Sequence, residues 1–402
     1  MLLSLGVTSV RAQNPPQPKR GFYPAGSYAL SDVETINTVN GNAIFRIPLV
    51  SLPAGRGGMS AGVGLYYNSK VWETFSYQDG RYEDYSYTTE LRESTAGGWR
   101  YGFKYEVQLV HRYYENQPLN PDCSQPENLY VYKLKMKFPD GSEHIFRPSG
   151  YTDPQGDNFF RIRPDGWQYN CYQPDSQVIF TGMTYYSADG TFMRLNFAPD
   201  GDNDPNNNPW TLSLPDGTRV TGGGTGEQYI YDRNNNSIVI RNVTYNNNPA
   251  TEIMDEMGRH IIVEYGPAVG PYPEMGRDFI HAWRMDNGQL TELVWTIRWR
   301  GVSVNQAYCA NPNDCNFGIV YYAGGVTGIS EIDLPAQSGG LSYLFTYNVD
   351  DPNDEGGKWG EVGTMTAPSG AREIQVCDVQ LHRDGRGRFK ELPLPKGPNL
   401  SA

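Results

Sequence analysis

The pentapeptide at 58–62, Gly-Met-Ser-Ala-Gly, has the G-x-S-x-G spacing of a hydrolase nucleophile elbow. That chemistry needs a strand, a sharp turn and a helix, which lift the serine hydroxyl above the sheet. The residues that follow, 63–68, are instead typical of a strand, and small residues at a β-turn explain the spacing equally well. We therefore expect no catalytic residue, and Ser60 supports only the alternative of a secreted hydrolase.

Three carboxylates at alternate positions, Asp200, Asp202 and Asp204, resemble the start of a calcium-binding loop, because hard oxygen ligands at this spacing can converge on Ca²⁺. Pro205 replaces the glycine of an EF-hand, and Thr211 replaces its bidentate glutamate. An EF-hand is therefore excluded. A looser calcium site and a solvated acidic turn both stay open, and no other cofactor is expected.

The N-terminus has the pattern of an exported protein. An apolar run at 2–10 precedes Val10-Arg11-Ala12, a small-x-small cleavage site, so residues 1–12 are expected to be a signal peptide. The basic segment that usually comes first is missing, which is compatible with a start further upstream. Residues 13–22 form a Pro-rich spacer. The sequence thus predicts a secreted or cell-surface protein.

Five cysteines in an exported chain indicate disulfides. Cys309 and Cys315 flank a turn-rich loop that a bridge would staple. Cys123 and Cys171 could form a second pair, although sequence alone does not assign the connectivity, and Cys377 is left over. Zinc is not expected, because no C-x-x-C pair or nearby histidine completes a ligand set.

The elements that position these residues are predicted to be strands. The 402 residues include 45 Gly, 29 Pro, 29 Tyr and 8 Trp, which favour turns and pleated surfaces over helices. Strand-like runs occur at 43–49, 129–138 and 260–265. The net charge of −12 disfavours nucleic acid and anionic membrane as partners. No apolar run approaches the roughly 20 residues of a membrane helix.

Asp-Gly turns recur beside these runs, because Asp-Gly supplies the positive φ of tight hairpins. They occur at 139–141, 164–166, 188–190, 199–201 and 215–217. The predicted fold class is all-β, with repeated antiparallel hairpins forming an extended or partly wound β-sheet scaffold.

Two segments carry a family resemblance. The segment at 231–236, YDRNNN, resembles the Tyr-Asp-x-x-Gly-Arg/Asn repeat of Rhs/YD-repeat proteins, with Tyr231 and Asp232 in place and Asn235 where the repeat has Gly. Asp255, Gly258 and Arg259 match the rest of the pattern, with a methionine in place of the tyrosine. The opening stretch, 30–70, is similar to the region before the repeats in secreted bacterial members.

The resemblance implies a β-rich shell that can enclose a C-terminal toxin or effector. Expected divisions are an N-terminal β domain at 23–180 and YD-repeat-like hairpins at 181–402. Only two repeat-like motifs are visible, so the chain is expected to be the front of a longer product or a reduced relative. The expected function is a secreted, non-enzymatic shell or cap that encloses or displays a protein or effector segment.

A carbohydrate-binding adhesin is the alternative from the binding class. Aromatic groups could stack on sugars, since exposed rings serve as amphipathic contacts. They include Tyr66-Tyr67, Tyr113-Tyr114, Tyr185-Tyr186, Tyr321-Tyr322 and the set Tyr82, Tyr85 and Tyr87. Packing between hairpins explains the same residues, and a glycan partner depends on which rings are exposed.

Overall fold

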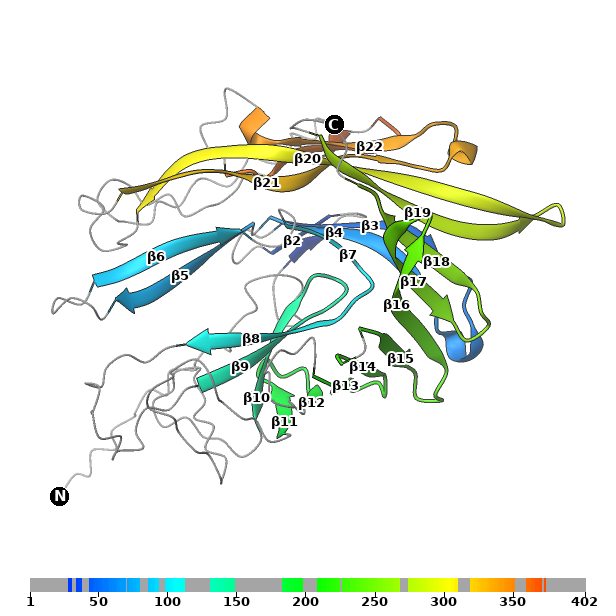
Figure 1. Ribbon diagram of the computed structural model, residues 1–402, viewed down its shortest axis with the longest axis horizontal. Coiled ribbons are helices and arrows are strands. Elements are labelled where there is room, and N and C mark those ends of the chain that lie inside the picture. The colour runs from blue at the N-terminus through cyan, green and yellow to red at the C-terminus, as the bar shows by residue number, and fades with distance from the viewer. Residues whose placement is uncertain are drawn as a thin grey trace, which may run out of the picture.

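The protein is a β structure throughout the part of the chain that the computed structural model describes (Figure 1). The described residues are 28–30, 34–37, 43–69, 71–79, 86–93, 98–112, 131–148, 183–197, 208–224, 226–267, 274–309, 319–350, 359–370 and 372–373. They contain no α-helix, and short 3-10 turns occur at Arg56–Gly58 (η1), Ala336–Ser338 (η3) and Asn348–Asp350 (η4). The all-β prediction is confirmed.

A five-stranded antiparallel sheet, called the inner sheet below, has the order β1-β2-β3-β4-β7. Its strands are β1 (Tyr28–Leu30), β2 (Glu34–Asn37), β3 (Ala43–Ser51), β4 (Gly62–Asn68) and β7 (Trp99–Tyr101). Between β4 and β7, the strands β5 (Trp72–Asp79) and β6 (Ser86–Glu93) pair only with each other.

All later strands belong to one large antiparallel sheet, in which each strand from β8 to β24 pairs with the next in the chain. Its first strands are β8 (Glu106–Arg112), β9 (Val131–Lys137), β10 (Glu143–Pro148), β11 (Met183–Ser187), β12 (Arg194–Phe197), β13 (Trp210–Ser213), β14 (Arg219–Gly222) and β15 (Gln228–Tyr231). The others are β16 (Ser237–Tyr245), β17 (Asn248–Asp255), β18 (His260–Tyr265), β19 (Glu274–Asp286), β20 (Gln289–Cys309), β21 (Ile319–Asp333), β22 (Ser342–Tyr347), β23 (Val362–Thr366) and β24 (Arg372–Glu373).

The expected hairpins form because apolar side chains alternate along the strands. In β16, Ile238 and Ile240 are buried while their chain neighbours are not, which is the period of a strand with one covered face. Asp-Gly pairs close three hairpins as predicted: Gly141, Gly190 and Gly217 have φ of 81°, 78° and 89°. The other two predicted Asp-Gly turns lie outside the described residues.

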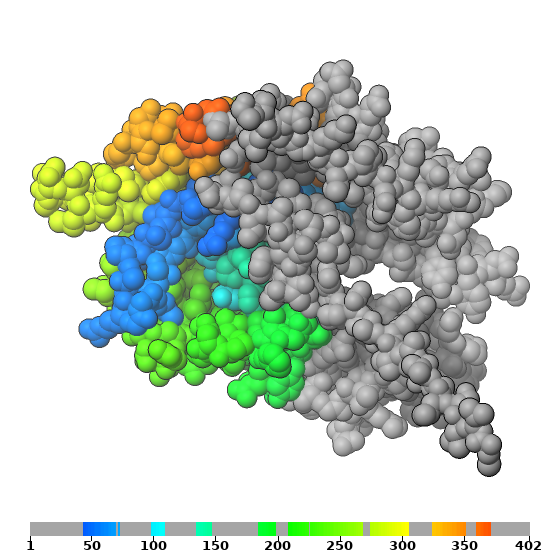
Figure 2. Space-filling view, turned by 180° about the vertical axis from the view of Figure 1, so that it is seen from behind, coloured from blue at the N-terminus to red at the C-terminus, as the bar shows by residue number. Residues whose placement is uncertain are grey.

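The large sheet curves around the inner sheet (Figure 1). One hydrophobic core joins Phe45, Leu65 and Trp99 of the inner sheet to residues of β16–β23 such as Ile280 and Ile297. Seen from behind, the blue residues of β3 and β4 reach the surface between green and orange strands of the large sheet (Figure 2). The inner sheet therefore fills part of the space that the large sheet surrounds.

A second core lies on the same inner face, along β8–β14. Leu134, Phe146 and Leu212 are completely buried there, and Ile230 packs against both cores. β10 and β11, which lie on either side of the expected domain division at 180/181, pair in one sheet. The second core and the β10–β11 pairing therefore both span the expected boundary at 180/181.

Polar contacts tie the two sheets together inside the first core. Tyr101 of β7 and Trp299 of β20 each donate a 2.7 Å hydrogen bond to Asp278 of β19. The Trp99 indole donates to the Tyr347 hydroxyl at 3.1 Å, and that hydroxyl donates to a backbone carbonyl at 2.8 Å. These five polar side chains thus have partners in the opposite sheet or on a neighbouring strand of the same sheet, as buried polar groups require.

Candidate functional site

The two motif segments form turns of the same geometry at neighbouring hairpins. In each, the backbone N–H of the motif aspartate donates to the carbonyl four residues on, at 3.0 Å for both Asp232 and Asp255. The residue three positions on has a positive φ, 64° at Asn235 and 77° at Gly258. Asparagine tolerates this conformation better than most residues, which explains how it replaces the glycine.

The aspartate side chains hold these turns closed. Oδ1 of Asp232 accepts the N–H groups of Asn234 and Asn236 at 2.7 and 2.9 Å, and the Asn236 amide donates to Oδ2 at 2.6 Å. The side-chain hydrogen bond from Asn236, with the backbone N–H donors, lowers the pKa of Asp232 below its ordinary value. The carboxylate is thus committed to the turn and is unsuited to act as a base.

Asp255 makes the same contacts with a different last partner. Its Oδ1 accepts the N–H groups of Met257 and Arg259 at 2.9 and 3.0 Å. Its Oδ2 pairs with the Arg259 guanidinium, whose Nε lies at 2.7 Å and Nη2 at 2.5 Å. Tyr231, the first residue of the other motif, lies on β15, where the Arg219 guanidinium stands 4.7 Å from its ring centre.

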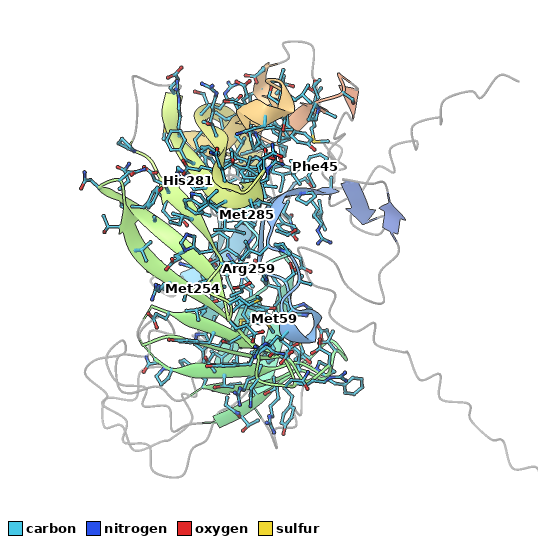
Figure 3. All side chains as sticks on the ribbon, turned by 90° about the vertical axis from the view of Figure 1, so that its right-hand side faces the viewer. Phe45, Met59, Met254, Arg259, His281 and Met285 are labelled. Atoms are coloured by element: carbon cyan, nitrogen blue, oxygen red, sulfur yellow. The ribbon has the colours of Figure 1, made fainter. Side chains whose placement is uncertain are left out.

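The loop between β3 and β4, residues 53–59, lies across both turns. Arg259 Nη2 donates to the Pro53 carbonyl at 2.7 Å, and the Arg56 N–H donates to the Glu256 carboxylate at 3.1 Å. A Cβ added to Gly57 would lie 2.3 Å from Asp232 Oδ2. Loop 53–59 with turns 232–236 and 255–259 is called the turn junction below, and the view in Figure 3 includes its residues Arg259 and Met59.

The turn junction joins the opening stretch to both repeat-like motifs, which lie about two hundred residues away in the sequence. Its polar groups satisfy one another, and its glycine permits an approach that a side chain would block. The arrangement can hold the hairpins in register.

Ser60 does not lie in a nucleophile elbow. Its hydroxyl donates to the Leu52 carbonyl at 2.7 Å, and the chain continues into strand β4 rather than into a helix. The motif is a loop that closes the β3–β4 connection. The strand context that the sequence predicted after this serine is confirmed.

A Ser-His-Asp arrangement that sequence reasoning missed occurs at two neighbouring turns. Ser142 Oγ lies 3.1 Å from His144 Nε2, and His144 Nδ1 lies 2.5 Å from Asp189 Oδ2. Ser142 also donates from Oγ to Asp140 at 2.7 Å. The Ser142 hydroxyl thus donates to Asp140 rather than to the imidazole, so it is not held as the nucleophile of a triad. The serine is also only 2% exposed.

The Asp189 carboxylate is the anchor of this arrangement. Burial alone would raise the pKa of Asp189, but hydrogen bonds from His144 and Thr191 outweigh it and lower that pKa below its ordinary value. Thr191 donates from its N–H and its hydroxyl at 3.1 and 2.5 Å. The cluster therefore braces the β9–β10 turn against the β11–β12 turn.

A second histidine cluster lies on the outer face of β18–β20. His281 Nδ1 is 2.8 Å from Glu292, and its Nε2 is 3.0 Å from Glu264, which also accepts from Asn246 and Asn248 at 3.1 and 2.5 Å. His281 thus has a carboxylate within hydrogen-bond distance of each ring nitrogen. The cluster connects the β16–β17 turn to β18–β20.

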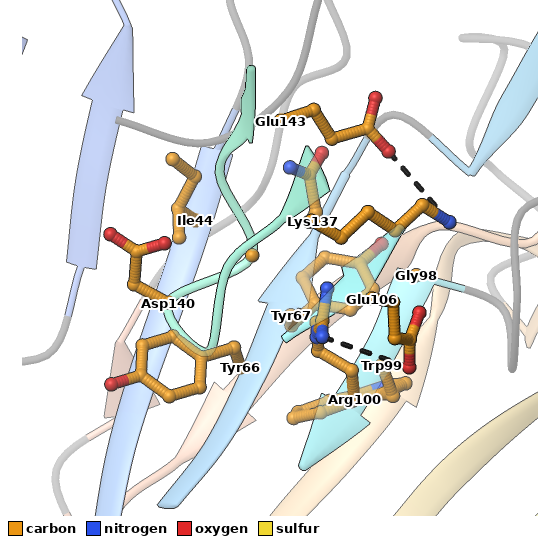
Figure 4. Close-up of a pocket in the computed structure, with 12 residues that line it drawn as sticks. Ile44, Tyr66, Tyr67, Gly98, Trp99, Arg100, Glu106, Lys137, Asp140 and Glu143 are labelled. Carbon is orange, nitrogen blue, oxygen red and sulfur yellow. Dashed lines mark ion pairs between the residues drawn. The ribbon is translucent and has the colours of Figure 1, made fainter. Parts of the chain in front are cut away.

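The cavity shown in Figure 4 lies between the inner sheet and the β9–β10 turn and has a volume of about 50 Å³. Glu143 pairs there with Lys135 and Lys137 at 3.3 and 3.8 Å, and Arg100 lies 3.9 Å from Glu106. A space of this size is large enough for ordered water.

A larger depression, of about 310 Å³, lies on β19–β21 and is lined by Arg277, Arg298 and Arg300. Two of these charges are already compensated, because Arg298 pairs with Asp333 at 2.7 Å and Arg300 with Asp350 at 2.9 Å. Arg277 alone has no carboxylate partner among the described residues.

The remaining predicted sites lie outside the described residues. They are the calcium candidates Asp200, Asp202 and Asp204 and the cysteines Cys123, Cys171, Cys315 and Cys377, while Cys309 is described only as the backbone end of β20. In the described part of the chain, no group of three or more His, Cys, Asp or Glu side chains could hold a metal ion.

No protein-family model, curated protein or solved structure matches this chain. The resemblance to Rhs/YD-repeat proteins stays a prediction from the sequence. Within the described residues, no helix has the length and apolar character needed to cross a membrane.

Proposed function

We propose that this chain is an exported, non-enzymatic β scaffold that acts as the cap of a shell similar to that of Rhs/YD-repeat proteins. The turn junction carries the proposal: the opening stretch and both repeat-like turns make direct contacts at Pro53, Arg56 and Gly57. Those are the three segments on which the sequence resemblance rests.

The filled interior supports a cap rather than a hollow wall. Trp99 and Tyr67 of the inner sheet are 1% and 0% exposed, and they pack in the core shared with the large sheet. A scaffold with this core offers its sheet edges and outer face for contact. Its partner in this proposal is a protein or effector segment that the assembled product encloses or displays at the cell surface.

The proposal is tested by isolating the native product from the cells that make this protein. Antibodies against the folded chain would recover it from the medium, the cell surface and the cell interior, and cross-linking before recovery would retain its partners. The proposal expects an exported product that is either longer than this chain or bound to a second polypeptide. Recovery only from the cell interior, as a lone chain, would contradict it.

A further inference from the structure

Five consecutive strands of the large sheet place a repeating set of side chains in one row. Tyr186 lies opposite Arg194, Arg194 opposite Ser213, Ser213 opposite Arg219, and Arg219 opposite Tyr231. Residues directly opposite on neighbouring strands share a face of the sheet. The row therefore reads Tyr-Arg-Ser-Arg-Tyr from β11 to β15, and it is called the Tyr-Arg row below.

The row lies on the outer face. Its chain neighbours Leu195, Leu212 and Val220 are completely buried in the second core, so the alternate residues point the other way. Tyr186 is 48% exposed, and Arg194 and Arg219 are both exposed. Ser213 and Tyr231 between and beside them are half-buried.

The two arginines keep their charge available. The Arg194 side chain has no hydrogen bond or ion pair with the described residues, and among them the Arg219 guanidinium contacts the Tyr231 ring and, at 3.5 Å, the Asn235 side chain. By contrast, Arg241 and Arg259 on nearby hairpins are each bound to a carboxylate. The two guanidinium groups make this row locally positive on a chain whose net charge is −12.

A parallel row supplies neutral hydrogen-bonding groups. Thr184, Asn196, Thr211, Thr221 and Tyr229 lie opposite one another across the same strands. The rings of Tyr229 and Tyr231 are nearly parallel, at 11° and 6.1 Å. The face thus combines flat rings, hydroxyl and amide groups and isolated cations, which together suit a sugar chain with acidic groups.

The spacing favours an extended chain that crosses the strands. With strands 4.7–4.9 Å apart, Arg194 and Arg219 lie roughly 10 Å from each other along the row, about the length of two linked sugar rings. Polynucleotides are bound by grooves that follow a charge at every nucleotide. Two arginines at this spacing match the carboxylates of every second sugar in a polyuronate, and the net charge of −12 disfavours a polynucleotide. We propose that the Tyr-Arg row binds an acidic polysaccharide, with uronate carboxylates on Arg194 and Arg219 and a sugar ring on Tyr186.

Titration calorimetry of the full chain with an oligogalacturonate, a maltooligosaccharide of the same length and an oligothymidylate tests this proposal. We expect binding of the oligogalacturonate only, weakened by salt. Arg194→Ala/Arg219→Ala should reduce the affinity about tenfold or more, because each loses a charge-assisted hydrogen bond. Arg194→Lys/Arg219→Lys should retain part of it, since charge remains without the planar fork.

The matched control is Arg277→Ala/Arg284→Ala, which removes the same charge elsewhere, including the unpaired arginine of the β19–β21 depression. It should leave the affinity within about twofold, because exposed distant charges are screened. The proposal is overturned if no oligogalacturonate binds or if the control loses as much affinity as the row variant. Equal binding of the neutral sugar, or oligothymidylate binding that depends on Arg194 and Arg219, would also overturn it.

Discussion

Replacing Tyr101 by phenylalanine removes a single hydroxyl from the contact between the two sheets. That hydroxyl donates a 2.7 Å hydrogen bond to Asp278, which is 8% exposed and also accepts from Trp299. Burial, together with the charge of Asp278, raises the pKa of Tyr101 well above its ordinary value, so the hydroxyl is a donor at neutral pH. The substitution leaves the ring in place and isolates the hydrogen bond.

The expected loss follows from the acceptor. A hydrogen bond to a charged group contributes about 1.5–3 kcal/mol, and Asp278 keeps its other donors, so we expect Tyr101→Phe to lower the free energy of unfolding by about 2 kcal/mol. Tyr229→Phe is the matched control: its hydroxyl donates to Glu227 at 2.6 Å on the exposed face, where the change should stay within about 0.5 kcal/mol.

Urea unfolding of the single variants and of Tyr101→Phe/Asp278→Asn gives the coupling directly. We expect a coupling energy of about 1–2 kcal/mol between the two positions, because they share one contact. Burial raises the pKa of Asp278, so the native carboxyl holds its proton to a higher pH than the unfolded one. Its contribution to stability therefore falls as pH rises through that pKa, and Asp278→Asn should remove this slope.

Additive effects of the two substitutions would refute the reasoning. A loss of unfolding free energy in Tyr101→Phe no larger than that in Tyr229→Phe would also refute it. Either result would mean that the hydrogen bond from Tyr101 to Asp278 does not stabilise the contact between the inner sheet and the large sheet.

Three further predictions concern other parts of the fold. Hydrogen bonds hold the pKa of Asp189 below its ordinary value. The stability that Asp189 contributes is therefore present above its unfolded pKa and is lost as pH falls through its folded pKa. Acid titration of Asp189→Asn, followed by tryptophan fluorescence, should lack this loss of stability. Gly328→Ala would place a Cβ 2.1 Å from the hydroxyl of buried Tyr347, so it should lower the free energy of unfolding in urea by about 1–3 kcal/mol. An unchanged unfolding curve would contradict the close packing of Gly328 against Tyr347. Ser60→Ala should cost about 1 kcal/mol and leave any esterase activity of the preparation unchanged; abolished activity would restore the hydrolase alternative.

Much of the fold could be predicted because strands and turns are local properties. The run at 260–265 is strand β18 with the predicted bounds, since apolar β-branched residues mark it in the sequence. Asp-Gly pairs at 140–141, 189–190 and 216–217 predict their turns because positive φ requires glycine there.

The contacts between distant segments could not be predicted in this way. Nothing local to Gly57 shows that Asp232 lies against it, because that contact depends on how the whole large sheet curves around the inner sheet. Ser142 and His144 carried a partial signal, because they are only two residues apart in the sequence, where Ser142 comes directly before strand β10 and His144 lies on it. Asp189, the third member of that cluster, comes from the neighbouring hairpin and only the pairing of β10 with β11 brings it near.

The central claim is that the opening stretch locks the repeat-like turns at the turn junction, and Gly57 and Gly58 test it as a pair. Both have positive φ, 68° and 81°, so alanine strains either backbone by about 1–2 kcal/mol. Only at Gly57 would the new Cβ displace the Asp232 carboxylate from its hydrogen bonds, because nothing lies within 4 Å of a Cβ at Gly58. The measurement is the unfolding free energy of Gly57→Ala and Gly58→Ala in urea. We predict that Gly57→Ala is less stable than Gly58→Ala by at least about 1 kcal/mol; equal stability of the two variants would contradict the claim.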